Sequence, residues 1–433
     1  MWAGGCVRDR LLGREPKDYD VATDATPEQI RDLFGRRRTF AVGAAFGVVT
    51  VVGGKGAGQL DVVTFRRDAD YSDGRHPDAV TFSTSPEEDA QRRDFTINGL
   101  YYDPLEDRVI DYVGGVEDLQ RRVVRAIGEP HARFAEDKLR MLRAVRFAAT
   151  YELCLDSDTL AAIRAMASQI LVVSAERIAQ EIRAMLVHPR RSDALRMLLD
   201  AGLLAHVLPE VLALRGMPRP TAHHRELDCW GRTLLVMDQL HEPSFALALA
   251  ALLHELGNAV AGSAPGSEPE LREGEAVAAR RASEVCRRWR LSRSDEDRVT
   301  WLVQNHMVLN DARAMRWSRL QRILVSPGIA DLVDLHEAIA KAASGDTSEI
   351  DYCRRMLEQP HEQLNLRPLI SGDDLIRHGV PPGERYKRLL DAVRDAQLEG
   401  AIGTKREALA LVDQLLADPP PGPQEPCTPS PDS

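Results

Sequence analysis

The apolar positions near the start of the chain form short runs that predict β-strands. VVTVV (48–52) and LDVVTF (60–65) are rich in β-branched residues and flank a glycine-rich turn, which predicts a hairpin. TPEQIRDLF (26–34) has the pattern of a helix start, with Thr26 as the N-cap and Pro27 at the first helical position. Strands and helices are therefore expected to alternate in the first part of the chain.

From about Asp118 onward, apolar residues recur at intervals of three and four, which is typical of amphipathic helices. Three segments carry this pattern: RFAEDKLRMLRAVRFAA (133–149), SAERIAQEIRAMLV (174–187) and SDALRMLLDAGLLAHVL (192–208). The predicted fold class is therefore α+β, with the strands near the N-terminus. The last residues, 417–433, are rich in proline and are expected to be disordered.

The composition is that of an ordinary globular protein without a membrane part. A length of 433 residues is enough for two to four domains. No apolar run is long enough for a signal peptide or a membrane span. The six cysteines are scattered, with no CxxC pair, and we interpret them as free thiols in a reducing cytoplasm.

The charge is unevenly distributed along the chain. The net charge of -10 argues against a nucleic-acid partner, but the local charge matters more than the total. Between Gln120 and Thr150, eight basic residues stand against three acidic ones. This segment predicts a surface to which a polyanion can bind.

Three short features near the N-terminus together indicate phosphate chemistry. GGCVRD (4–9) offers backbone amides and an arginine to phosphates. In DYD, Asp18 and Asp20 would point to the same face of a strand, and Asp61 falls in the predicted hairpin. Three such carboxylates can hold two Mg²⁺ ions for in-line phosphoryl transfer. Taken singly, each feature has an ordinary alternative: a turn, a solvated loop and a strand position that faces water.

The segment RRDFTINGL (92–100) adds groups that suit a nucleotide. Arg92 and Arg93 match phosphates by charge and by their forked donors. Asp94 and Asn98 can orient an arginine or contact a ribose hydroxyl. The alternative is the start of a helix with a pair of surface arginines.

The segment EDKLRMLRAVRF (136–147) places a polar side chain at every third residue: Asp137, Arg140, Arg143 and Arg146. At 3.6 residues per turn these positions wind around a helix as a polar ladder. The alternative is a solvated face with ordinary ion pairs. Three arginines that share one carboxylate are poorly matched for pairing alone, and this favours a functional role.

An Asp–Arg pair can select bases by counting donors and acceptors. Cytosine and adenine each present an amino donor beside a ring-nitrogen acceptor, whereas uracil and guanine present an oxygen beside an N–H. A carboxylate only accepts and a guanidinium only donates, so the pair matches C and A. A mismatched base leaves buried polar groups unpaired, at a cost of roughly 1–3 kcal/mol each.

Read in order, these segments resemble the class II tRNA nucleotidyltransferase/poly(A) polymerase family over roughly residues 4–185. The C-terminal region, PLISGDDLIRHGVPPGERYKRLLDAVRDAQLEG, is also similar to that family. The motifs that carry the resemblance are GGCVRDRLLGREPKDYDVATDATPEQ, TFRRDADYSDGRHP, RRDFTINGLYYDP, DYVGGVEDL, EDKLRMLRAVRFA and SAERIAQEI.

The resemblance implies a polymerase-β-like nucleotidyltransferase head followed by an all-helical neck, body and tail. The family usually has a helix and a strand before the glycine pair, and only Met1–Ala3 precede it here. Either the start of the sequence is misassigned, or the first strand of the head is incomplete. The implied parts are the head (1–117), the neck with a base-templating helix (118–187), the body with a degenerate HD-like region (188–320), the RNA-binding tail (321–416) and the disordered end (417–433).

The resemblance also implies roles for the residues of the head. Asp18 and Asp20 would be the metal ligands, and with Asp61 they would form the catalytic carboxylates. The residues implied to bind the nucleotide in this part of the chain are Gly5, Arg8, Arg93, Asp94 and Asn98.

For the neck, the resemblance implies that Asp137 and Arg140 template the incoming base. Arg143 and Arg146 would complete the nucleotide-binding site. Gly114–Gly115 in DYVGGVEDL would form the hinge that lets the site switch from C to A.

The segment ALALAALLHELGN resembles the HD-type phosphohydrolase segment of some family members, with departures. The His-Asp pair is His254–Glu255 here, and Arg232 and Gly274 stand where relatives carry histidines. His254 and His306 are retained. Because a metal site needs several converging ligands, we expect this region to be a scaffold and not a working phosphohydrolase.

The function expected from the sequence is addition of CCA, or part of it, to the 3′ end of tRNA or tRNA-like RNA. The implied substrates are CTP and ATP, the cofactor is Mg²⁺ and the compartment is the cytoplasm, with no membrane and no obligate protein partner. One alternative is a poly(A) polymerase or an enzyme that adds only A, which the catalytic motifs do not separate. A second is an RNA-binding paralogue without activity, which Asp18, Asp20, Asp61 and Arg93 disfavour.

Overall fold

The computed structural model describes most of the chain, which forms two compact units, Met1–Gln304 and Asn305–Ser433. Of the end predicted to be disordered, 418–433 lies outside the described residues. The described ranges are 1–54, 58–68, 80–218, 227–257, 268–360, 364–383 and 385–417, without the side chains of 68 and 268–272.

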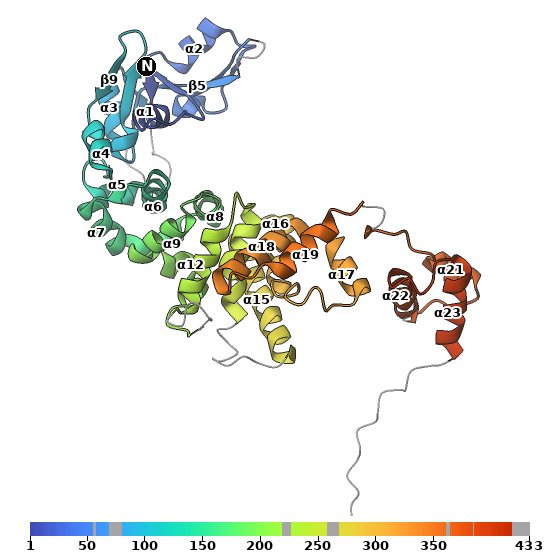
Figure 1. Cartoon of the computed structure of the whole chain (residues 1–433). Helices are drawn as coiled ribbons and strands as arrows, with labels where there is room; N and C mark the ends of the chain where they lie inside the picture. The colour runs from blue at the N-terminus through green and yellow to red at the C-terminus, as the bar shows by residue number, and fades with distance from the viewer. Residues whose placement is uncertain are drawn as a thin grey trace, which may run out of the picture. The chain divides into compact units, whose positions relative to one another are not determined.

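The first unit begins with a mixed β-sheet, drawn in blue in Figure 1. Its strands are β1 (Trp2–Ala3), β2 (Asp20–Thr23), β3 (Thr39–Phe40), β4 (Val48–Val52), β5 (Gln59–Thr64), β8 (Leu100–Asp103) and β9 (Arg108–Asp111). Among the described residues these seven strands lie in the order β3-β4-β5-β2-β1-β8-β9. β2 and β5 run parallel and the other neighbours run antiparallel. The predicted hairpin is confirmed as β4 and β5.

Helix α2 (Pro27–Phe34) covers one face of this sheet. The Thr26 hydroxyl accepts from the backbone N–H of Gln29, whose side chain accepts from that of Thr26, so the predicted N-cap is confirmed. Alternate residues of β4 and β5 point toward the helix, which leaves the residues between them on the opposite face. The buried cluster under α2 consists of Ile30, Val49, Val51 and Val62.

A second buried cluster lies on the opposite face of the sheet and includes Ala22, Ala90 and Tyr101. Because Ala22 is two residues from Asp20, helix α3, which carries Ala90, lies on the same face as Asp20. The short elements of this region are α1 (Gly5–Leu11), η1 (Ala44–Phe46), β6 (Arg66–Asp68), β7 (Val80–Phe82), α3 (Pro86–Gln91) and η2 (Thr96–Asn98).

Helices follow the sheet, with α6 at the centre of the first group. Met141, Leu142, Ala144 and Val145 of α6 are fully buried, and the helix packs on α8 and α9. The predicted helical segment 133–149 is in fact two helices. The elements are α4 (Gly115–Arg121), β10 (Val123–Val124), α5 (Pro130–Glu136), α6 (Leu139–Tyr151), β11 (Cys154–Leu155), α7 (Ser157–Met166), η3 (Ala167–Val172), α8 (Ala175–Leu186) and α9 (Arg191–Asp200).

The rest of the first unit packs around α13, whose residues are all buried. A helix that is apolar on every side is typical of the centre of a large core. No described helix is both long and apolar enough to cross a membrane. The elements are α10 (Leu204–Val207), α11 (Pro209–Leu212), α12 (Cys229–Gln239), α13 (Phe245–Leu253), η4 (His254–Gly257), α15 (Glu268–Arg288) and α16 (Arg293–Gln304).

The second unit is helical in the part that the structure describes. Arg322 on α17 pairs with Asp391 and Asp395 on α22. The elements are α17 (Trp317–Leu324), α18 (Ile329–Ala343), α19 (Ser348–Leu357), α21 (Gly372–Arg377), α22 (Arg385–Leu398) and α23 (Lys405–Ala417). The predicted α+β class, with strands near the N-terminus and helices beyond, is therefore confirmed. The boundaries predicted at 117, 187 and 320 stay predictions.

Candidate active site

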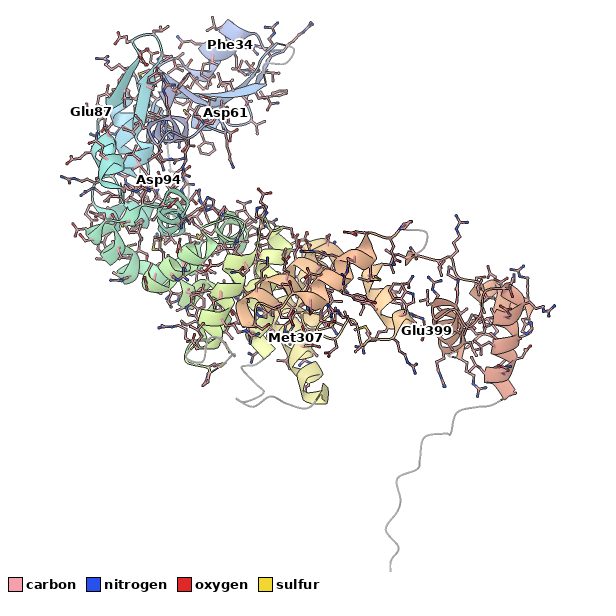
Figure 2. The ribbon with its side chains drawn as sticks, viewed as in Figure 1. Phe34, Asp61, Glu87, Asp94, Met307 and Glu399 are labelled. Carbon is pink, nitrogen blue, oxygen red and sulfur yellow. The ribbon has the colours of Figure 1, made fainter. Side chains whose placement is uncertain are left out.

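Asp20 and Asp61 lie side by side on the sheet face opposite α2 (Asp61 is labelled in Figure 2). They are register partners on β2 and β5, and Asp61 is also the register partner of Thr50 on β4. Side chains of register partners point to the same face, and neighbouring strands are ~4.8 Å apart. The Thr50 hydroxyl donates to the Asp61 carboxylate at 2.6 Å. The fold thus brings together two carboxylates that are 41 positions apart in the sequence.

Asp18 lies near this site, but it is not on the strand where it was predicted. Strand β2 begins at Asp20, and Asp18 lies in a bend before it. The strand periodicity used to place Asp18 beside Asp20 does not apply, and that part of the prediction was wrong. Asp18 is still close enough to raise the pKa of Asp20 through charge repulsion.

The carboxylates of this site repel one another. Partial burial raises the pKa of Asp20 above its ordinary value, Arg93 opposes this, and Asp61 and Asp18 raise it further. Within the described ranges, no three His, Cys, Asp or Glu side chains already surround one point. An open pair of carboxylates nevertheless fits Mg²⁺, which usually takes one or two carboxylates and completes its shell with water and phosphate oxygens.

Arg93 lies at the edge of the carboxylates and against the glycine pair. Its Nη1 donates to the backbone oxygen of Asn98 at 3.2 Å, and its charge lowers the pKa of Asp20. Gly4 has a φ of 72°, and a Cβ there would lie 2.7 Å from Nη1 of Arg93. Gly4 is therefore required both by its backbone and by the guanidinium beside it. Gly5 begins helix α1.

Asp89, which was not predicted as a site residue, binds both arginines of the RRD motif. Its Oδ2 accepts from Arg93 (Nε 3.3 Å, Nη2 3.0 Å), and its Oδ1 accepts from Arg92 (Nε 2.9 Å, Nη2 2.7 Å). The Tyr101 hydroxyl donates to Oδ2 at 2.6 Å. Burial alone would raise the pKa of Asp89, but Arg93 and Arg92 outweigh it and lower the pKa. The i,i+3 and i,i+4 spacing to the arginines was the signal that could have found this residue.

Arg8 and Asn98 belong to a buried polar network. Arg8 is 5% exposed, and its Nη1 donates to Oδ1 of Asn98 at 2.5 Å. Its other donors reach Asp9 and the Tyr151 hydroxyl. The Asn98 amide donates in turn to Asp94 at 2.9 Å. The structure thus gives Arg8 protein partners, and its expected contact with the nucleotide stays a prediction.

Asp94 continues this network from the head into helix α6; Figure 2 labels it where the sheet region passes into the helices. Its Oδ2 accepts from Arg143 (Nε 2.9 Å, Nη2 2.7 Å). Burial alone would raise the pKa of Asp94, but Arg143 and the hydrogen bond from Asn98 lower it to about 2. Asp94 therefore orients an arginine, which is one of the two roles expected for it.

The arginines of α6 do not share one carboxylate, so that argument from the sequence was wrong. Asp137 is extended, with a φ of -144°, and lies before the helix. The arginines instead have separate partners, two of which come from elements that are distant in the sequence. The pairs are Arg140–Glu136, Arg143–Asp94 and Arg146–Glu181.

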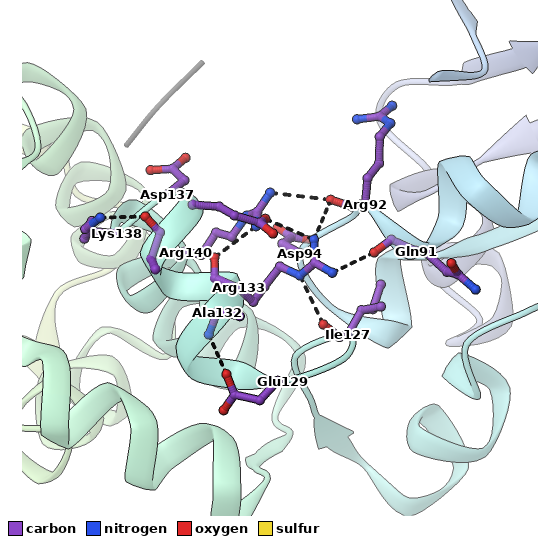
Figure 3. Close-up of polar contacts among 12 residues, drawn as sticks. Gln91, Arg92, Asp94, Ile127, Glu129, Ala132, Arg133, Asp137, Lys138 and Arg140 are labelled. Carbon is purple, nitrogen blue, oxygen red and sulfur yellow. Dashed lines mark hydrogen bonds and ion pairs between the residues drawn. The ribbon is translucent and has the colours of Figure 1, made fainter. Parts of the chain in front are cut away.

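Asp137 and Arg140, the expected base-reading pair, are each held by other residues. Nη1 and Nη2 of Arg177 donate to the two oxygens of Asp137 at 3.3 and 2.7 Å. Arg140 donates to the backbone oxygen of Arg133 at 3.0 Å, and Figure 3 shows it extending toward Arg92. Arg177 lies in the SAERIAQEI motif, to which no residue role was assigned.

The glycine pair expected to form a hinge is closely packed on one side. Gly114 is left-handed, with a φ of 80°, and Gly115 begins α4. A Cβ on Gly115 would lie 2.2 Å from the backbone oxygen of Thr96. Asp111 accepts from the backbone N–H of Gly114 at 2.9 Å. The hinge role stays a prediction.

Comparisons with known proteins agree with this geometry. Residues 1–125 match the family model of the Poly A polymerase head domain, and residues 152–214 match that of the probable RNA and SrmB-binding site of polymerase A. A CCA-adding enzyme of Lactobacillus gasseri is 30% identical over 408 residues, which is 94% of this chain and 91% of that enzyme. The chain belongs to the class II CCA-adding enzyme/poly(A) polymerase family.

Two further comparisons add to this resemblance. A CCA-adding enzyme of Geobacillus thermodenitrificans is 43% identical over 206 residues, 48% of this chain and 50% of that enzyme. The crystal structure of the Bacillus stearothermophilus CCA-adding enzyme in complex with CTP has a TM-score of 0.70 at 28% identity. It covers 96% of this chain and 93% of that chain. The expected polymerase-β-like head, followed by a helical C-terminal region, is confirmed.

In the region that resembles an HD domain, Arg232 lies beside Glu255 and the retained His254. Arg232 lies 3.3 Å from Glu255, which is 3.5 Å from Nε2 of His254, and all three are buried. A guanidinium at this place opposes a divalent cation. Gly257 faces Gly274, since a Cβ on Gly257 would lie 2.1 Å from the Gly274 backbone oxygen. These contacts support the scaffold interpretation.

Proposed function

We propose that this chain adds CCA to the 3′ end of tRNA, using CTP and ATP. The observation that carries the proposal is the register pair Asp20–Asp61, with Asp18 nearby and the Arg93 cation at its edge. Membership of the CCA-adding family supports the same activity. The acceptor is tRNA or a tRNA-like RNA, and no protein partner is needed for this chemistry.

The family implies use of a divalent metal, and we propose that the metal is Mg²⁺ held by Asp18 and Asp20, with Asp61 as the third catalytic carboxylate. When bound, Mg²⁺ would lower the pKa of the RNA 3′-hydroxyl and neutralise charge on the leaving pyrophosphate. The chain's own contribution is a set of acceptor oxygens on one sheet face. The Thr50 hydroxyl keeps one oxygen of Asp61 in a fixed orientation.

The triphosphate side of the site is supplied by arginines. Arg93 and Arg92 are anchored through Asp89, so their guanidinium groups are in place before a nucleotide arrives. Pre-organised cations lose little entropy when they bind phosphate oxygens. The backbone at Gly4–Gly5 allows close approach to the same phosphates.

We assign the choice of base to Asp137 and Arg140. Asp137 is the acceptor and Arg140 is the donor, and together they match C and A. Arg177 fixes both oxygens of Asp137, and this limits the directions from which a base edge can approach. Arg143 and Arg146 form ion pairs with Asp94 and Glu181, which are not on α6. Arg143 therefore connects α6 to the head, and Arg146 connects it to α8.

The test uses three tRNA acceptors that end before CCA, after the first C and after CC. Each is incubated with Mg²⁺ and with CTP or ATP alone, and the products are sequenced. CTP should extend the first two acceptors to CC, and ATP should add one A to the third. No extension of any acceptor by a folded sample rejects the proposal.

The same products distinguish CCA addition from the alternatives of A-only and poly(A) addition. The match to the Poly A polymerase head domain is compatible with all three activities. An A-only enzyme would leave the first two acceptors unchanged with CTP. A poly(A) polymerase would add many A residues to the third acceptor. We propose the cytoplasm as the compartment, because nucleoside triphosphates and immature tRNA meet there.

A further inference from the structure

We propose that a cluster of basic residues beside the active site binds a backbone phosphate of the RNA acceptor. The inference rests on the proposed function, because the ligand is the same RNA. The residues of this cluster, called the basic cluster below, are Arg14, Lys17, Arg122, His188 and Arg190.

Three arginines of the basic cluster meet at the C-terminal end of α6. Nη1 of Arg14 donates to the backbone oxygen of Thr150 at 3.1 Å. Arg122 donates to the backbone oxygens of Tyr151 at 3.2 Å and of Glu152 at 3.0 Å. They come from the loop after α1, the end of α4 and, for Arg190, the loop before α9. Three separate segments thus bring positive charge to one point.

Arg190 completes this group and shares its charge with acidic neighbours. It forms an ion pair with the Glu152 side chain and lies 3.7 Å from Asp193. Its backbone N–H donates to Nδ1 of His188 at 3.1 Å. The acceptor role of Nδ1 places the imidazole proton on Nε2, so the ring offers a donor while it is neutral.

Capping of α6 accounts for part of this arrangement. The last carbonyls of a helix carry partial negative charge, and arginines near them are favourable. Capping does not account for Lys17, which bonds to no helix carbonyl and forms no ion pair among the residues that the structure describes. Arg14 likewise has no carboxylate partner in that part of the chain.

Several cationic side chains lie close enough to His188 to affect its pKa. Burial lowers the pKa of His188, and Arg14, Arg191, Lys17 and Arg190 lower it further. Arg14, Lys17, Arg122 and Arg190 are all exposed, so an anion from solvent can reach them. Forked guanidinium groups and a lysine are the donors that suit a phosphate.

The position of the basic cluster favours the RNA backbone over a free anion. Lys17 is the chain neighbour of Asp18, so a phosphate held here lies next to the catalytic carboxylates. His188 and Arg190 fall in the segment that matches a probable RNA-binding model, whereas Arg14 and Lys17 come from the head. A basic track that follows the backbone is the usual way to hold a single-stranded end without reading its sequence.

The test measures binding of tRNA ending in CC to the full chain by fluorescence anisotropy at several salt concentrations. The variant Arg14→Ala/Lys17→Ala should bind about tenfold more weakly. Its slope of log K against log salt should be smaller by about 1–2. The matched control is Arg108→Ala, which removes an exposed arginine of the head that pairs with Glu106. The control should bind as the wild type does.

Single variants separate phosphate binding from helix capping. Lys17→Ala should weaken RNA binding without lowering the melting temperature, because Lys17 caps nothing. Arg14→Lys should bind more tightly than Arg14→Ala, since it keeps the charge. If Lys17→Ala and Arg14→Ala bind tRNA as the wild type does at every salt concentration, the basic cluster is not a phosphate site.

The wild-type sample is also tested for extension of the same RNA by ATP. Extension together with unchanged binding by the variants overturns this inference alone. A wild type that binds the RNA but does not extend it overturns the proposed function, and the binding data still decide the role of the basic cluster.

Discussion

Asp89 illustrates how one buried carboxylate can set the geometry of a site that it does not touch. Each of its oxygens serves a different arginine, and the Tyr101 hydroxyl and the backbone N–H of Arg66 complete its hydrogen bonds. Without Asp89, Arg92 and Arg93 would adopt several rotamers. Fixing a long cationic side chain costs considerable entropy, and the hydrogen bonds to Asp89 offset that cost. Asp89 therefore acts as a positioning residue for the arginines.

We expect Asp89→Asn to raise KM for CTP and ATP by about tenfold, because an amide cannot accept from both arginines and Tyr101 at once. Tyr101→Phe removes one neutral hydrogen bond and should change KM much less. The measurement is steady-state kinetics with a CC-ending tRNA, alongside direct tRNA binding, which should not change. A lower melting temperature with unchanged KM values would show that Asp89 only stabilises the head.

Asp94 gives a prediction for acid stability. Its pKa of about 2 lies below the ordinary value, so its contribution is fully present above the ordinary pKa and is lost as the pH falls toward 2. The shift corresponds to about 2 kcal/mol of unfolding free energy. We expect Asp94→Asn to lower the unfolding free energy by about that amount at pH 7 and by less near pH 3. Urea unfolding at both pH values checks this, and an equal loss at both would contradict it.

At the scale of single elements, the sequence predicted the features that are determined by residues close together in the chain. The β4–β5 hairpin and the start of α2 were found because their signals lie within a few residues: β-branched runs, Thr26 and Pro27. The expected strand at Asp18 was wrong because a DxD pattern alone does not show where a strand begins.

The partners of the arginines on α6 could not be predicted in the same way. Arg143 pairs with Asp94, 49 positions away, and Arg146 with Glu181, 35 positions away. Such contacts depend on which elements pack together, and no local pattern reports them. The same reason explains why the anchor of Asp137 by Arg177, 40 positions away, was not found.

Arg177 on α8 provides a test at this scale. We expect Arg177→Ala to weaken the preference for CTP and ATP over UTP and GTP by about tenfold, because Asp137 loses the donor that fixes its carboxylate. The matched control is Arg183→Ala on the same helix, which breaks an exposed pair with Asp295. Misincorporation is measured with each nucleotide alone. Equal base preference in both variants would remove Arg177 from base selection.

At the scale of the whole molecule, the sequence overestimated one basic surface. The segment from Gln120 to Thr150 has an excess of basic residues, but several of them are paired in the fold. The paired arginines are Arg125 with Asp118, Arg133 and Arg140 with Glu136, Arg143 with Asp94 and Arg146 with Glu181. Which basic residues are available to RNA therefore depends on the ion pairs that form in the folded protein. Arg122 of this segment and Arg14 of the head come together because both donate to backbone oxygens at the C-terminal end of α6.

Because different side chains carry RNA binding and catalysis, we predict that the two can be removed independently. Phosphate contacts are distributed over exposed basic residues, whereas the chemistry depends on Asp18, Asp20 and Asp61. Charge stabilisation at a metal centre contributes several kcal/mol, so Asp20→Ala should reduce extension by at least about 100-fold. Chelation of divalent ions should have the same effect on the wild type.

In both cases the affinity for CC-ending tRNA should stay within about twofold, because neither change removes a cationic side chain that contacts the RNA backbone. Asp24→Ala, an exposed carboxylate four positions after Asp20, is the control and should keep full extension. Extension and binding are measured on the same samples at one salt concentration. Joint loss of binding and extension in Asp20→Ala would mean that Asp20 organises the RNA site, and the assignment of the carboxylates to the metal would then have to be abandoned.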